Sequence, residues 1–101
     1  MSIDKSLVKA LRAEAHRLKL KPVILMGQKG LTDNVHLEIE RAINHHELVK
    51  IKLAAGDREE KKSCIESICQ HHKCHLIQSI GHVIIVFREN PELKKFTSSL
   101  T

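Results

Sequence analysis

The chain has 101 residues, 42% of them apolar, and no apolar run approaches the ~18 residues of a membrane span. Residues 1–5 lack the apolar core of a signal peptide. We therefore expect one globular domain in the cytoplasm, with no membrane partner and no need of disulfides.

Charge is distributed unevenly along the chain. Residues 1–30 hold seven Lys/Arg against two acidic residues, residues 31–60 four against seven, and residues 61–101 six against three, for a net charge of +5. A basic excess in the first third fits a polyanionic partner better than a uniform excess would. Because Phe87 and Phe96 are the only aromatics, proteins that stack bases on aromatic platforms are disfavoured. Contacts to phosphate, sugar and overall shape are expected instead.

Residues 4–20 are predicted to form an amphipathic helix. Its apolar face consists of Leu7, Leu11, Ala15 and Leu18. Lys21-Pro22 is expected to end the helix, because the residue before a proline disfavours the α region. Basic residues lie away from the apolar face and form a ridge: Lys5, Lys9, Arg12, His16 and Lys19.

A glycine-containing loop follows the first predicted strand. Residues 23–26 are an unbroken apolar run, for which we expect an interior strand covered on both faces. Gly27-Gln28-Lys29-Gly30 comes next, and helix-capping residues begin at Thr32. Glycine lets the backbone approach another molecule and adopt positive φ, while the free N–H groups of the next helix favour an anion. A G-x-x-G loop clamps the nucleic-acid backbone in some RNA-binding modules. Equally, its glycines could serve only the geometry of a tight connection.

The middle of the chain predicts helix, strand and helix. The helix covers residues 32–44, and His45-His46-Glu47 connects it to a strand over residues 48–54. Apolar residues alternate with Lys50 and Lys52 along this strand, so one of its faces is expected to be wet and basic. A further helix is predicted from Asp57 to about His72.

The last two strands, residues 76–80 and 83–88, are predicted to form a hairpin around Gly81-His82. The element order α-β-α-β-α-β-β predicts an α/β (α+β) fold in which three helices pack compactly on a four-stranded mixed sheet. Right-handed crossovers would make that sheet largely parallel, with an antiparallel final hairpin. We expect the domain to cover residues 1–91 and residues 92–101 to be a short polar tail.

Several motifs occur together and in one order. They are the stretch from Leu20 to Thr32, the stretch from His45 to Lys52, Asp57-Arg58-Glu59, and the stretch from Ile80 to Arg88. With the basic helix before them, they resemble the YhbY family of bacterial RNA-binding proteins, the stand-alone form of the CRM (chloroplast RNA splicing and ribosome maturation) domain. The resemblance covers about residues 5–90.

This resemblance implies a fold similar to the C-terminal domain of translation initiation factor three. It also implies RNA binding and association with ribosomal RNA in precursors of the large ribosomal subunit. The family's G-x-x-G loop corresponds to Gly27, Gln28, Lys29 and Gly30, and its basic surface to the first helix and the Lys50/Lys52 strand. His82 stands where relatives often have a lysine. The RNA-contacting residues expected on the basic surface are Lys9, Arg12, Lys19, Lys21, Lys50 and Lys52.

A cluster of potential metal ligands lies near the end of the third predicted helix. It comprises Cys64, Cys69, His71, His72, Cys74 and His75. The spacing is not C-x-x-C, no second ligand pair lies at a finger-like distance, and Cys64 and Cys69 would be about 140° apart around a helix. We therefore predict no metal site, no cofactor and no disulfide here.

The sequence predicts a monomeric RNA-binding protein that is not an enzyme and has no small-molecule substrate, because nothing brings a nucleophile, a base and an oxyanion hole together. Three other functions stay open. These are a general binder of double-stranded nucleic acid without a ribosomal role, a zinc-dependent or thiol enzyme using the Cys/His cluster, and an adaptor for an acidic protein.

Overall fold

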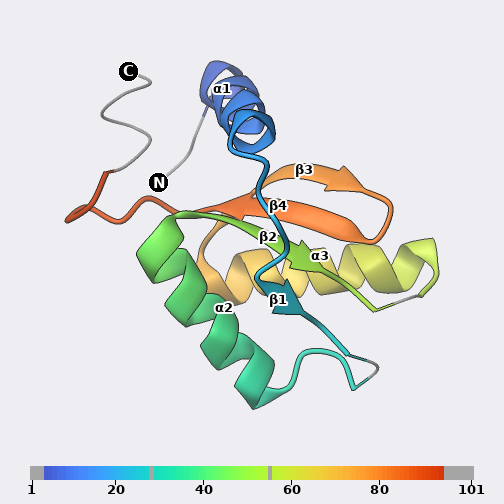
Figure 1. The fold of residues 1–101 in the computed structure, drawn as a ribbon. Coiled ribbons are helices and arrows are strands. Elements are labelled where there is room, and N and C mark those ends of the chain that lie inside the picture. The colour runs from blue at the N-terminus through green and yellow to red at the C-terminus, as the bar shows by residue number, and fades with distance from the viewer. Residues whose placement is uncertain (1–3, 28, 55, 95–101) are drawn as a thin grey trace.

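Three helices and four strands follow one another in the predicted order α-β-α-β-α-β-β (Figure 1). The structure is a computed structural model that describes residues 4–27, 29–54 and 56–94. The elements are α1 (Lys5–Arg17), β1 (Ile24–Leu25), α2 (Asp33–His46), β2 (Leu48–Lys52), α3 (Arg58–His72), β3 (His75–Ile80) and β4 (Val83–Phe87). Among the described residues, no helix is both long and apolar enough to cross a bilayer. Most of the predicted tail, residues 95–101, lies outside the described residues.

The four strands form one mixed sheet in the order β1-β2-β4-β3. β1 pairs with β2 in parallel, whereas β4 is antiparallel to both β2 and β3. The prediction of a largely parallel sheet is therefore wrong. The crossovers do make β1, β2 and β3 run in one direction, but the hairpin folds β4 back between β2 and β3, which leaves a single parallel pairing.

Helices cover both faces of the sheet, and Figure 1 shows α1 on one side and α2 with α3 on the other. Beneath α2 and α3, Ile39, Ile43 and Ile68 pack against the inward side chains of β1, β2 and β4. On the opposite face, Leu11 and Ala15 of α1 belong to a second cluster with Leu48, Ile77, Ile85 and Phe87. A single short helix covers this face, so part of it stays exposed.

The first helix ends earlier than predicted and by a different mechanism. α1 ends at Arg17, before Lys21-Pro22. Lys19 adopts a φ of +51°, and its N–H donates to the carbonyl of His16. The N–H of Leu20 donates to the carbonyl of Ala15. This pair of bonds is the Schellman motif, here with a lysine where glycine is usual.

The first strand is not an interior strand, contrary to the prediction. β1 has two residues and lies at the edge of the sheet. Ile24 is buried beneath α2 and α3, but Val23 and Leu25 are 56% and 67% exposed. These two side chains face the side of α1, which contacts β3 most and does not cover β1. Continuous apolar character therefore did not indicate burial on both faces.

The predicted connection between α2 and β2 is also shorter than expected. His45 and His46 belong to the last turn of α2, and the chain turns at Glu47, which is fully buried with a φ of +61°. The N–H of Asn90 donates to Glu47 Oε2 at 2.7 Å, and the N–H of Arg88 donates to the Glu47 carbonyl. These bonds hold a backbone conformation that is uncommon for a non-glycine residue.

Candidate nucleic-acid interface

Three connections gather at one edge of the sheet, which we call the loop end. β1 and β2 are parallel, so the loops after them, residues 26–30 and 53–57, leave the same edge. The Gly81-His82 turn lies at this edge too, because Leu53 donates its N–H to the His82 carbonyl at 2.7 Å. Figure 1 shows the loop after β1, the loop before α3 and the β3–β4 turn on the same side of the molecule. α2 and α3 both begin here.

The glycine loop is tightly turned and open to the outside. The N–H of Gly30 donates to the carbonyl of Gly27 at 3.0 Å, which closes a turn, and Gly30 has a φ of +77°. No atom lies within 4 Å of a Cβ placed on either glycine. Glycine at position 30 therefore allows the positive φ of the turn, whereas glycine at position 27 leaves open space at the surface. Gln28 lies outside the described residues.

A groove of about 380 Å³ separates the glycine loop from the start of α3. Gly27, Gly30 and Met26 line one side of it, and Leu53, Ala54, Gly56, Glu60, Lys61 and Cys64 line the rest. Lys29 and Lys52 are exposed at the loop end. Neither makes a hydrogen bond or ion pair with any other residue that the structure describes. Their ammonium groups are available to an anionic ligand.

Lys61 was missed by the sequence reasoning. It lies one turn into α3 and lines the groove opposite the glycines, and Arg58 begins the same helix. The signal was present in the predicted order, because parallel strands send their following loops to the same edge of a sheet. A βαβ unit from residue 23 to residue 54 should have placed the start of the next helix beside the glycine loop.

The helix N-termini contribute less than the sequence suggested. Thr32 Oγ1 accepts the N–H of Val35 at 3.2 Å, and Asp57 Oδ1 accepts the N–H of Glu60 at 2.8 Å. Acidic residues occupy the first turn of both helices. Capping and acidic charge offset the positive end of each helix dipole. Lysine side chains are therefore the main source of attraction for an anion at this end.

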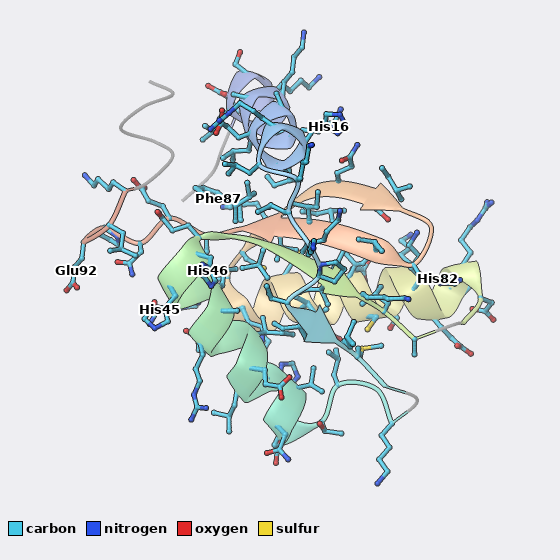
Figure 2. All side chains as sticks on the ribbon, viewed as in Figure 1. His16, His45, His46, His82, Phe87 and Glu92 are labelled. Carbon is cyan, nitrogen blue, oxygen red and sulfur yellow. The ribbon has the colours of Figure 1, made fainter. Side chains whose placement is uncertain are left out.

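The other predicted basic residues form a second group around α1. Lys9, Lys19 and Lys21 are exposed. Arg12 reaches the outer strand, where its Nη2 donates to the Ile77 carbonyl at 3.4 Å. Lys50 is half-buried and donates from Nζ to the carbonyl of Leu20 at 3.1 Å. In Figure 2, His16 projects from α1 and His82 lies at the far end of the hairpin.

The predicted wet and basic face of β2 is therefore only partly correct. Leu48 is buried against α1, Lys50 is half-buried beneath the chain that leaves α1, and Lys52 alone is exposed. Register places Lys52 between Leu25 of β1 and Val83 of β4. Lys52 thus belongs to the loop end, while Lys50 belongs to the group around α1.

The Cys/His cluster does not come together as one site. Cys64 contacts Met26, with its Sγ 3.3 Å from the thioether sulfur, and burial raises the pKa of its thiol. A hydrogen bond with Cys69 raises the pKa of the buried Cys74 thiol. The same hydrogen bond lowers the pKa of the Cys69 thiol. Cys64 and Cys74 are therefore packed, protonated thiols rather than reactive thiolates. His71 and His72 instead face α2.

A polar network joins α2, α3 and the end of β4. Arg88 donates from Nη2 to Glu40 Oε2 at 2.7 Å and from Nη1 to Glu40 Oε1 at 3.1 Å. Its Nη1 also donates to the His72 carbonyl at 2.8 Å. His72 Nδ1 lies 2.9 Å from Glu40 Oε1. The hydrogen bonds from Arg88 and then from His72 lower the pKa of Glu40 from 4.5 to about 2, so the carboxylate stays ionised.

Taken together, the fold and its loop end define a small α/β protein that presents a glycine loop and unpaired lysines beside a groove. A model of the CRS1/YhbY (CRM) domain matches residues 3–88. The chain belongs to this family.

Two relatives and one solved structure show how close the likeness is. The chain is 36% identical over 101 residues to the "Probable RNA-binding protein PA4753" of Pseudomonas aeruginosa, covering 100% of this chain and 95% of that protein. It is 44% identical over 84 residues to an "RNA-binding protein" of Haemophilus influenzae, covering 83% of each. The solution structure of SAV1595 from Staphylococcus aureus, a hypothetical protein and suggested RNA binder, superposes with a TM-score of 0.75 at 25% identity. The alignment covers 87% of this chain and 90% of that one.

Proposed function

We propose that this protein binds structured RNA by gripping its sugar–phosphate backbone at the loop end. One observation carries the proposal: Gly27 and Gly30 have open space above them, at the edge where Lys29 and Lys52 present unpaired charge. A backbone that can be approached closely, flanked by cations, suits a chain of phosphates. The relatives whose names describe RNA-binding proteins support the same chemistry.

Recognition in this proposal depends on shape and charge rather than on base sequence. The only Phe, Tyr or Trp side chain among the described residues is Phe87, which is fully buried between the sheet and α1. Bases therefore have no exposed phenyl, phenol or indole ring to stack on in that part of the chain. Affinity should fall steeply with salt and differ little between unrelated duplexes.

The basic residues around α1 extend this surface. Lys9, Arg12, Lys19 and Lys21 would add phosphate contacts along a helical RNA that leaves the loop end, each worth a modest share of the affinity. We propose that the protein acts as a monomer in the cytoplasm on ribosomal RNA of precursor large subunits, as its resemblance to the family implies. Its role there would be to aid subunit assembly without catalysis.

Gly27→Val is the sharpest test of the loop. Gly27 has no positive φ and no atom near its Cβ position, so valine should leave the fold intact and only obstruct the approach of a ligand. We expect RNA affinity to fall at least about tenfold, while thermal stability stays within about 0.5 kcal/mol. The measurement is fluorescence anisotropy with two unrelated RNA duplexes, beside thermal unfolding.

Lys29→Ala and Lys73→Ala make a charge-matched pair. Lys29 lies in the glycine loop, and Lys73 caps the far end of α3. We expect Lys29→Ala to reduce the slope of log K against log salt by about one, and Lys73→Ala to leave it unchanged. Equal effects of the two variants, together with unchanged affinity in Gly27→Val, would remove the loop end from the interface.

The ribosomal role needs a separate test. Sedimentation of a cell lysate through a gradient should show the protein with precursor large subunits, and RNase should release it. A protein that binds duplex RNA in vitro but stays at the top of the gradient would be a general binder of double-stranded nucleic acid.

A further inference from the structure

Three histidines from two helices meet on the side of the sheet away from α1. His36 lies in the first turn of α2, and His71 and His72 end α3. One ring nitrogen from each lies within 4.8 Å of the other two. The rings of His36 and His71 are stacked with centroids 4.0 Å apart, and His36 Nδ1 lies 2.9 Å from His72 Nε2. In the part of the chain that the structure describes, no other group of His, Cys, Asp or Glu converges in this way.

The surroundings of His72 fix which of its nitrogens faces the cluster. Both oxygens of the Glu40 carboxylate accept hydrogen bonds from Arg88, so His72 Nδ1 is the donor to Oε1 and carries the proton. Nε2 of a neutral His72 then presents a lone pair toward His36. A carboxylate that holds the far nitrogen of an imidazole is the arrangement that orients metal-bound histidines. Arg88 holds that carboxylate in turn through two hydrogen bonds.

The distances suit a shared metal ion after a small adjustment. Zinc bound to imidazole nitrogens at about 2.0–2.1 Å in a tetrahedron separates those nitrogens by about 3.3 Å. His36 Nδ1 and His72 Nε2 are slightly closer than this, since they share a proton instead. His71 is exposed, so its ring can turn without disturbing the core.

The cluster opens to solvent and is chemically selective. His36 and His71 line a shallow surface hollow together with Leu31, Ser67 and Gln70, which leaves a path for an ion and for a water ligand. Imidazole ligands favour Zn²⁺, Ni²⁺ and Cu²⁺ over Mg²⁺ and Ca²⁺, which prefer oxygen ligands. The cysteines nearby do not belong to this group.

We propose that His36, His71 and His72 form a binding site for a divalent transition-metal ion of the zinc class, with Glu40 as the residue that positions His72. The ion would join the first turn of α2 to the last turn of α3, and water would complete its coordination. None of its three ligands is among the residues proposed to contact RNA, although Leu31 of its hollow follows Gly30 of the glycine loop. The proposal departs from the sequence-based expectation of no metal, which considered only the cluster from Cys64 to His75 and not His36, far along the chain from it.

Calorimetric titration of the tag-free protein with ZnCl₂ tests the site. We expect one equivalent of Zn²⁺ to bind and the thermal midpoint to rise with zinc concentration. Changing Glu40→Gln should weaken binding about 10–100-fold with the stoichiometry retained. Changing His36→Ala or His71→Ala should weaken it by about 100-fold or more, because each removes a ligand rather than its support. His71 is exposed, so His71→Ala should fold normally.

His82→Ala and Cys64→Ser are the controls. His82 is an exposed histidine on the β3–β4 turn, and Cys64 is the thiol that lines the glycine-loop groove. Both variants should bind zinc as the unchanged protein does. Co²⁺ in place of zinc should show no thiolate charge-transfer band. Absent stoichiometric binding, full affinity in either His36→Ala or His71→Ala, or a thiolate band lost in Cys64→Ser would each overturn the proposal.

Discussion

The loop end and the network of His36, Glu40, His72 and Arg88 are both polar, yet they are built in opposite ways. In the network each charged group has a partner: Arg88 meets Glu40 and the His72 carbonyl, and Glu40 meets His72. At the loop end, Lys29 and Lys52 have no such partner among the described residues. Polar groups with partners stabilise the fold. Exposed cations without partners add little to folding stability and are available to attract an anionic ligand.

Arg88→Ala should show the largest difference between its effect on stability and its effect on RNA binding. It removes four hydrogen bonds to Glu40, Asn44 and the His72 carbonyl. We expect the free energy of unfolding to fall by about 2 kcal/mol, because these bonds involve charged, partly buried groups. RNA affinity of the folded fraction should stay unchanged, as read by urea denaturation and anisotropy. Loss of affinity without loss of stability would place Arg88 at the interface and reverse the comparison.

Glu40→Gln should have a smaller effect that depends on pH. The folded-state pKa of Glu40 is about 2, below its ordinary 4.5, so the folded state releases the proton more readily than the unfolded chain does. The stabilisation is therefore fully present above about pH 4.5 and is lost as pH falls toward 2. Unfolding curves measured with a chelator present should show the two proteins converging over this range. The exposed Glu38→Gln on the same helix is the control, and a difference independent of pH would contradict the assignment.

The sequence predicted the element types and order well and the edges of the sheet poorly. Helical periodicity identified Leu11 and Ala15 as buried positions because burial repeats with the helix, but Leu18 on the same predicted face follows the end of α1 and is 44% exposed. Periodicity says nothing about which strands become neighbours. The edge position of β1 and the insertion of β4 depend on how the hairpin folds back, which is a long-range choice.

The same distinction between local and long-range information applies to the residues of the candidate sites. The glycine loop could be found from the sequence, because its residues are contiguous and their chemistry is local. Lys61 and His36 could not be found so easily, because each becomes relevant only through contact with a segment far along the chain. The Schellman ending of α1 was missed for another reason: Lys19 takes the position where glycine is the usual signal.

Lys52→Ala and Lys50→Ala compare an unpaired and a hydrogen-bonded lysine on one strand. Both side chains belong to the same face of β2, but Lys52 is exposed and Lys50 donates to the Leu20 carbonyl. We expect Lys52→Ala to weaken RNA binding a few-fold, to reduce the salt slope by about one, and to leave stability unchanged. Lys50→Ala should instead lower the free energy of unfolding by about 1 kcal/mol, because it leaves a carbonyl without its donor. Salt-dependent anisotropy gives the RNA affinity of each variant, and thermal unfolding gives its stability.

If both variants weaken RNA binding equally and neither affects stability, the ammonium of Lys50 leaves the Leu20 carbonyl to contact RNA. The basic surface would then be continuous from the loop end to α1.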